Sequence, residues 1–138
     1  MLLPRILLCL GVAAGTLSIW DTLSHTWDPS YQAPALALGP THTNYHAFRE
    51  FMLSVGAVLV ELYGVFQPAA KRTRPLWVAM CLTAVFYYGG WWLPWPLFGL
   101  RTPNLVATVD HLIATILCLA GVGFAWPYFS DKSELRED

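Results

Sequence analysis

Residues 105–126, LVATVDHLIATILCLAGVGFAW, decide the fold because they form an apolar segment long enough to cross a membrane. About 20 helical residues cover the ~30 Å hydrocarbon layer of a bilayer. The chain has three other such stretches, which predicts helices at about residues 3–24, 42–66, 75–93 and 103–126. A helix satisfies its own backbone hydrogen bonds in lipid. The sequence therefore predicts one all-α domain over residues 1–138, a polytopic membrane protein with a four-transmembrane-helix bundle, and a flexible tail at 129–138.

The composition of the whole chain agrees with a membrane protein. Of the 138 residues, 56% are hydrophobic and 12% are charged, and the mean hydropathy is +0.47. Soluble domains carry about 25% charged residues. The formal net charge is −1 and no basic stripe is present, so no nucleic-acid partner is expected. The first apolar run lacks a small-residue cleavage pattern, so we expect it to stay as an anchor helix rather than act as a signal peptide.

Basic residues set the expected orientation. Four spans place both termini and the turn AAKRTRP (residues 69–75) on one side of the membrane, together with six of the eight Lys and Arg residues. Positive charge favours the cytoplasmic side. We therefore expect both termini in the cytoplasm, in either the endoplasmic reticulum or a bacterial inner membrane.

Local signals mark several helix ends. Thr73 and Thr102 are candidate N-caps, each followed by a proline in the first turn. Pro94 and Pro96 end the third helix. The segment APALALG (residues 33–39) is too short to span, and the sequence leaves open whether it lies on the interface or covers the bundle. The motif Gly11–Gly15 indicates close helix packing, either within the chain or between chains.

The outer half of the predicted bundle gathers ionisable groups from three helices. They are Asp21 and His25 from the first helix, His42, His46, Arg49 and Glu50 from the second, and Asp110 and His111 from the fourth. Ionisable groups at membrane depth usually face the bundle interior and pair with one another. We therefore expect these side chains to form one polar cluster.

Asp110 is the strongest member of the cluster because it lies about two turns inside its helix. Its expected partners are Arg49, His25 or His46. Adjacent helical residues point about 100° apart, so only one of Asp110 and His111 is expected to face the centre, and we choose Asp110.

Glu61 stands apart from the outer cluster. It follows Glu50 by eleven residues and lies nearly on the same helix face, further toward the inner side. It either continues the polar track inward or, as we prefer, extends its side chain to reach Lys71 or Arg72 at the inner surface.

Three hypotheses explain the outer cluster: a structural hydrogen-bonded network, acid–base catalysis on a lipophilic substrate, and a metal or haem site. His42, His46 and Glu50 are four residues apart in turn, a spacing that can hold an ion. The paired Glu-x-x-His repeats of di-iron bundles are missing from the sequence. We therefore expect no metal and no other cofactor.

The sequence resembles the four-helix EXPERA-type membrane domain, the class that includes the emopamil-binding sterol isomerase and the sigma-2-receptor-like proteins. The residues that carry the resemblance are the pair His46-x3-Glu50, the basic turn KRTRP (residues 71–75) and the polar fourth helix. The resemblance implies a lipophilic cavity open to the bilayer and proton transfer across a carbon–carbon double bond. It carries over only His46 and Glu50 as a catalytic pair. Asp21, His25 and His42 depart from the family pattern, and Asp110 and His111 have no clear counterpart in it.

Together these observations predict a membrane-embedded acid–base enzyme, isomerase- or cyclase-like, acting on a sterol, a terpenoid or a similar lipophilic small molecule. We expect His46 and Glu50 to transfer protons and Asp110 to serve as charge partner or second acid. His25 and His111 are expected to have orienting roles, and Arg49 to keep the carboxylates ionised. The residues expected to contact the substrate are Asp21, His42, Trp91 and Trp92. The alternative is a non-catalytic membrane scaffold or accessory subunit. Whether the chain forms a homo-oligomer or joins a larger membrane complex stays open.

Overall fold

The computed structural model describes residues 1–31 and 42–130, and these residues are helical apart from the turns between helices. The long helices are α1 (Leu2–Ser24), α2 (His42–Phe66), α3 (Arg74–Trp92) and α5 (Leu105–Ala125). The short elements are the α-helix α4 (Pro94–Phe98) and the 3-10 helices η1 (Pro29–Tyr31), η2 (Ala69–Lys71) and η3 (Trp126–Tyr128). The all-α prediction is confirmed, and the long helices differ from the expected ranges by at most two residues at either end. The segment 33–39 and residues 131–138 lie outside the described part.

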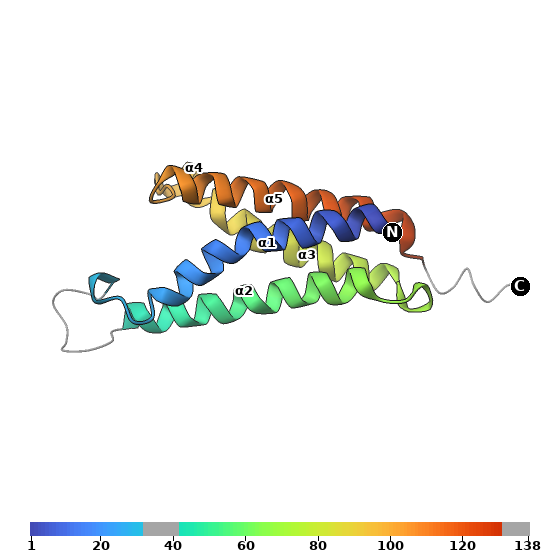
Figure 1. The fold of residues 1–138 in the computed structure, drawn as a ribbon, viewed down its shortest axis with the longest axis horizontal. Coiled ribbons are helices and arrows are strands. Elements are labelled where there is room, and N and C mark those ends of the chain that lie inside the picture. Colours follow the sequence, from blue (N-terminus) through green and yellow to red (C-terminus); the bar gives the residue numbers. More distant parts are fainter. Residues whose placement is uncertain (32–41, 131–138) are drawn as a thin grey trace, which may run out of the picture.

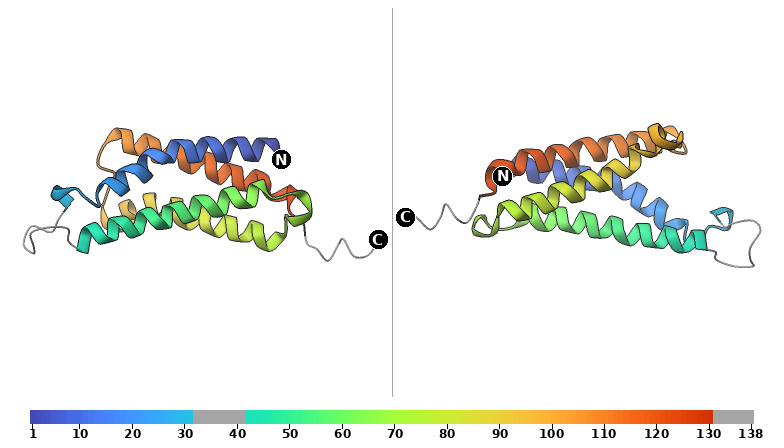
Figure 2. Two further views of the ribbon diagram at one scale, coloured as in Figure 1. Left: turned by 60° about the horizontal axis from the view of Figure 1, so that its bottom comes forward. Right: turned by 180° about the vertical axis from the view of Figure 1, so that it is seen from behind.

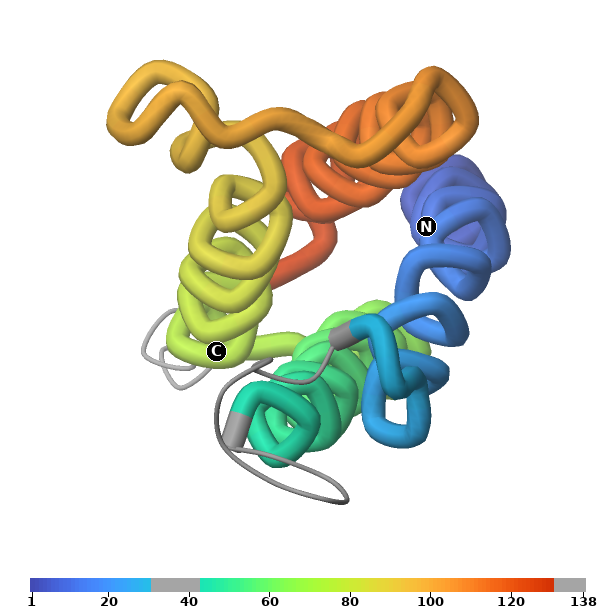
Figure 3. The backbone as a smooth tube through the Cα atoms, turned by 90° about the vertical axis from the view of Figure 1, so that its left-hand side faces the viewer, coloured from blue at the N-terminus to red at the C-terminus, as the bar shows by residue number. Residues whose placement is uncertain are grey.

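The four long helices form a bundle in which the chain runs up and down (Figure 1). Seen along the bundle, α1 lies beside α2 and α5, and α3 closes the ring between them (Figure 3). The N-terminus, η2 and η3 lie at one end, which we call the terminal end. The segments η1 and α4 lie at the opposite end, the far end.

Helices α1 and α5 make the most extensive contact of the bundle, and glycines allow their close approach. A Cβ on Gly11 would lie 2.5 Å from Cys118 Sγ and 3.0 Å from the Cys118 backbone nitrogen. A Cβ on Gly121 would lie 2.8 Å from Leu8. Gly15 faces Ala114 on the same contact. The Gly11–Gly15 motif therefore packs within the chain, which settles the alternative that the sequence left open.

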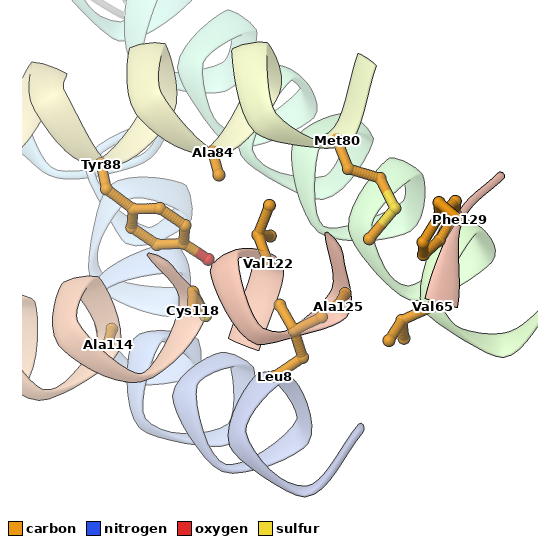
Figure 4. Packing of buried hydrophobic residues seen from close by; sticks show 10 residues of the cluster. All are labelled: Leu8, Val65, Met80, Ala84, Tyr88, Ala114, Cys118, Val122, Ala125 and Phe129. Carbon is orange, nitrogen blue, oxygen red and sulfur yellow. The ribbon is translucent and has the colours of Figure 1, made fainter. Parts of the chain in front are cut away.

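The tightly packed core extends from the terminal end of the bundle to Ala114 and Tyr88, and Figure 4 shows its side chains. Its buried side chains come from all four long helices and from the segment after η3: Leu8, Val65, Met80, Ala84, Tyr88, Ala114, Cys118, Val122, Ala125 and Phe129. Phe129 is 1% exposed, and the Ser130 backbone nitrogen donates to Arg72 O over 3.2 Å. The prediction that a flexible tail begins at residue 129 is therefore wrong for Phe129 and Ser130, because burial of the ring and a backbone bridge fix both residues.

One predicted helix start needs correction. The N-cap of α5 is Asn104 rather than Thr102, and the Asn104 side chain accepts a hydrogen bond from the Ala107 backbone nitrogen over 2.9 Å. Thr73 is the N-cap residue of α3 as expected, but its side chain makes no capping hydrogen bond. Since both Thr and Asn are good caps, the sequence could not decide which of them starts the helix.

The prolines after α3 start a new turn of helix in place of a simple loop. α3 ends at Trp92, and Pro94 begins α4, where a missing N–H costs nothing. Gly99 ends α4 with a φ of 71°, a left-handed conformation that glycine adopts without strain. This turn sends the chain back across the far end toward α5.

Large apolar side chains cover the outside of the bundle on all four long helices. Examples are Leu17 (65% exposed), Leu53 (68%), Phe86 (77%) and Ile116 (56%). Soluble monomers rarely expose such wide apolar surfaces. By length and composition, α1 and the segment Leu105–Tyr128 can span a membrane. α2 and α3, which the sequence also predicted to span, do not meet the same criterion, because α2 carries charged residues and α3 has several Trp and Tyr residues. The prediction of four spans therefore stays a prediction for α2 and α3.

Candidate functional site

The far half of the bundle is less tightly packed because α1 does not stay beside α5 along its whole length. Near its C-terminal end α1 turns away from α5 and crosses toward the start of α2 (Figures 1 and 2). Asn44, which is 1% exposed, fixes this crossing. Its Nδ2 donates hydrogen bonds to His25 O over 2.8 Å and to Asp28 O over 3.3 Å. Space therefore remains between α1, α3 and α5.

This space is a pocket of about 400 Å³, which we call the far-end pocket. Ligand sites for small organic molecules typically measure about 300–1,000 Å³. Polar and apolar groups from α1, α2, α3, α5 and the segment before α5 line it: Leu17, Ser18, Asp21, Thr22, Glu50, Ser54, Tyr87, Trp91, Pro103, Asn104, Val106, Ala107, Asp110 and His111. Five of the expected site residues meet here, namely Asp21, Glu50, Trp91, Asp110 and His111.

Asp110 is the most buried acid of the pocket, with 8% exposure. Its Oδ2 accepts a hydrogen bond from the Ser18 hydroxyl, which joins α5 to α1. The donor to Asp110 is therefore Ser18 rather than the expected Arg49, His25 or His46. The Arg49 guanidinium lies 5.8 Å from the Tyr45 ring centroid on the outside of α2.

His111 also lines the far-end pocket, which corrects the expectation that only one of the adjacent pair faces the centre. The pocket extends around α5 from α1 to α3, so two neighbouring side chains reach it in different directions. The His111 ring stacks on Trp91 with centroids 4.3 Å apart and an interplanar angle of 16°. Its Nδ1 is buried and finds no hydrogen-bond partner in the described part of the chain. That nitrogen is therefore a buried polar group whose hydrogen-bonding capacity no described residue satisfies.

α2 and α3 form the wall of the far-end pocket that lies across from α1 and α5. Ser54 is buried and donates its hydroxyl to the backbone oxygen of Glu50 over 2.8 Å. This hydrogen bond therefore leaves the Glu50 carboxylate itself unbonded to Ser54. The Tyr87 ring meets Tyr88 and Trp91 edge-on, with centroid distances of 4.9 Å and 5.2 Å. These contacts fix the aromatic wall that faces the acids.

The expected His46–Glu50 pair is split by the structure. Glu50 lines the pocket, whereas His46 is exposed on α2 with its ring 5.6 Å from that of Tyr45. His25 is the C-cap residue of α1 and offers its carbonyl oxygen to Asn44.

Of two further expected substrate contacts, His42 begins α2 and its side chain lies outside the described part. Trp92 faces a different hollow, and its Nε1 donates to Thr115 Oγ1 over 2.9 Å.

Glu61 lies deeper in the bundle and is completely buried. Tyr88 donates its hydroxyl to Glu61 Oε2 over 3.2 Å, and Glu61 Oε1 has no partner among the described residues. The preferred prediction, that Glu61 reaches Lys71 or Arg72 at the surface, is therefore wrong. Its helix face turns toward α3, and the Arg72 side chain instead donates to Gln67 O over 2.8 Å.

Sequence reasoning missed several polar residues of the pocket, above all Ser18, Ser54 and Tyr87. A signal was present for all three. Ser18 precedes Asp21 by three residues and Ser54 follows Glu50 by four, which places each on the same helix face as an expected acid. Tyr87 likewise precedes Trp91 by four residues.

The far-end pocket combines three carboxyl groups, an imidazole and a phenol with aliphatic walls, and no Lys or Arg of the described residues lines it. These groups can donate and accept protons next to an apolar molecule. Within residues 1–31 and 42–130, no three His, Cys, Asp or Glu side chains are placed to hold a metal ion together.

Comparison with known proteins gives no relative for this chain: no family model matches the sequence, and neither a curated protein nor a solved structure shows significant similarity. The functional interpretation therefore rests on the residues and their geometry.

Proposed function

We propose that this protein is a four-span membrane enzyme that moves protons on a lipophilic molecule, such as a sterol or terpenoid, in an isomerase- or cyclase-like reaction. The observation that carries this proposal is the far-end pocket, where Asp21, Glu50, Asp110 and His111 meet beside aromatic and aliphatic walls. Isolated acids at membrane depth are costly and usually mark a functional site.

The apolar outside of the bundle and the distribution of basic residues support the membrane setting. Arg5 and Arg72 lie at the terminal end, where they donate to Val65 O over 3.1 Å and to Gln67 O over 2.8 Å. Arg74 lies there as well, 3.4 Å from the Trp126 ring centroid. Since cytoplasmic segments are rich in Lys and Arg, we place the terminal end in the cytoplasm.

The proposed chemistry needs an acid and a base on two sides of the substrate. Asp110 on α5 and Glu50 on α2 both face the pocket, and His111 lies beside Asp110. One protonated group gives a proton to one carbon of a double bond, and a carboxylate or imidazole removes a proton from a neighbouring carbon. The double bond shifts, no electrons are gained or lost, and solvent or proton exchange between the groups restores the starting state. We assign the proton transfer to Glu50, Asp110 and His111.

A non-catalytic scaffold is the second candidate, and one observation favours it. The Asp110 carboxylate already accepts the Ser18 hydroxyl, so it links α1 to α5 whether or not a substrate binds. In a scaffold the same acids would serve only to fix the position of helices.

Variants separate the two candidates. Purified protein is incubated with unsaturated sterols and terpenoids, and products are separated by chromatography and identified by mass spectrometry and NMR. The enzyme hypothesis predicts conversion by the wild type, and a loss of about 100-fold or more in Glu50→Gln and Asp110→Asn, the range typical of acid–base groups. Both variants should keep their helix content and melting temperature.

Asp28→Asn is the matched control. Asp28 lies outside the pocket, where Ser30 donates its backbone nitrogen over 2.8 Å and its hydroxyl over 2.7 Å to Oδ1. These hydrogen bonds lower the pKa of Asp28, and an asparagine oxygen can still accept them. Unchanged conversion in this variant supports the assignment. Two results favour the scaffold. One is conversion that persists in both Glu50→Gln and Asp110→Asn. The other is no conversion by the wild type together with loss of folding in Asp110→Asn.

A further inference from the structure

The far end carries a second, separate hollow, which we call the tryptophan pocket. It measures about 230 Å³ and is lined by Trp91, Trp92, Trp95, Leu100, Arg101 and two threonines. This volume is below the ~300–1,000 Å³ of sites that enclose a whole drug-sized ligand. The pocket therefore suits one end of a longer molecule.

Arg101 gives this pocket its charge. The left-handed turn at Gly99 brings the chain back, and the Arg101 guanidinium lies 4.8 Å from the Trp95 ring centroid. Among the residues that the structure describes, no carboxylate lies within ion-pair distance of this guanidinium. An arginine keeps its charge under all ordinary conditions and binds phosphate oxygens through two parallel hydrogen bonds.

The two threonine hydroxyls and the Trp92 indole nitrogen of the pocket are already engaged. The hydroxyls of Thr102 and Thr108 bond to each other, and Thr108 also donates to Asn104 O over 3.0 Å. Trp92 donates its Nε1 to Thr115 on α5. The Trp92 ring is thereby fixed in place, and Arg101 is the charged group among the described lining residues that can recognise an anion.

We propose that the tryptophan pocket binds an anionic phospholipid, with the phosphate on Arg101 and the first part of an acyl chain against Trp92, Trp95 and Leu100. An unpaired cation beside three indole rings matches a molecule that is anionic at one end and apolar at the other. The inference goes beyond the proposed reaction. It rests only on the part of that proposal that places the far end at a membrane surface.

Trp91 connects this site to the far-end pocket, since it lines both hollows and stacks on His111. A lipid bound in the tryptophan pocket therefore contacts the ring that orients His111. Trp91 is therefore part of both pockets, but each pocket binds its own ligand.

Native mass spectrometry of the full chain tests the proposal. Protein released from detergent micelles is offered equal amounts of dioleoyl phosphatidylglycerol and dioleoyl phosphatidylcholine, and the ratio of the singly bound adducts is measured. The wild type should prefer phosphatidylglycerol. Arg101→Gln should lower this preference about fivefold, the effect of one cation near a charged surface.

Arg49→Gln is the matched control, because Arg49 also lies on the outside near the far end and over an aromatic ring, but outside the tryptophan pocket. The proposal requires that this variant keeps the wild-type preference and that Arg101→Lys is intermediate, since lysine retains the charge without the planar fork. An equal loss in Arg49→Gln, or no preference in the wild type, overturns it. Displacement of the lipid by millimolar inorganic phosphate also overturns it, because the site would then bind the free anion rather than a lipid.

Discussion

At the scale of single residues, the buried Asp110 carboxyl is hydrogen-bonded to another helix and also lines the far-end pocket. One carboxylate oxygen accepts the Ser18 hydroxyl, while the side chain still lines the far-end pocket. The sequence could indicate Asp110 through its depth in an apolar helix. It could not indicate Ser18 as the partner, because that pairing depends on how α1 and α5 are aligned.

Ser18→Ala should destabilise the protein by about 1.5–3 kcal/mol, since it leaves a carboxylate without its hydrogen-bond donor. Turnover should fall in parallel. Thr16→Ala is the control on the same helix: Thr16 is exposed and bonds only to backbone oxygens of the preceding turn. Thermal unfolding in detergent measures both variants, and equal melting temperatures for the two would contradict the role given to Ser18.

Tyr88→Phe should destabilise the protein by about 1–3 kcal/mol, because the buried Glu61 carboxyl loses its donor. The double variant Tyr88→Phe/Glu61→Leu should recover part of this loss, since replacing both partners leaves no unpaired polar group. Tyr63→Phe, at an exposed position of α2, serves as the control. Chemical or thermal unfolding gives the comparison, and a double variant less stable than Tyr88→Phe alone would contradict this view of the pair.

At the scale of helices, the sequence predicted the long elements to within two residues at either end, because a long, largely apolar run lies within each of them. It failed where neighbouring residues offered equivalent choices, as with Thr102 and Asn104 before α5. It also failed for His46 and Glu50, which are one turn apart on α2, yet only Glu50 reaches the pocket. The Asn44 hydrogen bonds hold the crossing of α1 toward α2, and this crossing has no sequence pattern of its own.

Gly11→Ala should cost about 1–3 kcal/mol, because the added methyl group would meet both the sulfur and the backbone of Cys118. Gly123→Ala provides the opposite case: nothing lies within 4 Å of the position that the added methyl group would take, and alanine favours the helix by up to about 1 kcal/mol. Melting temperatures should therefore shift in opposite directions. A stabilising Gly11→Ala would show that α1 and α5 are less closely packed than described.

At the scale of the whole molecule, the close-packed core and the two pockets meet near the middle of the bundle. The core extends from the terminal end to Ala114 and Tyr88, and both pockets lie toward the far end. The sequence predicted the gathering of acids in the outer half from the order of the spans. The volume of the pocket could not be predicted, because it depends on where α1 leaves α5.

The proposed topology places the terminal end in the cytoplasm and the far end on the other side. In a background with Cys9, Cys81 and Cys118 replaced by serine or alanine, Lys71→Cys and Trp27→Cys put one exposed thiol at each end. A membrane-impermeant maleimide added to right-side-out vesicles should label the position-27 variant and leave the position-71 variant unlabelled until detergent is added. Labelling of both, or the reverse pattern, would contradict the topology.

The most direct test of the central claim, that the far-end pocket transfers protons to a lipophilic substrate, is hydrogen exchange during turnover. The wild type is incubated in D₂O with a substrate that it converts, and the product is analysed for carbon-bound deuterium. Proton transfer by Glu50, Asp110 and His111 predicts deuterium at a carbon of the shifted double bond in the wild type and none in Asp110→Asn. A product that forms without deuterium, or the same incorporation in Asp110→Asn, would contradict the claim.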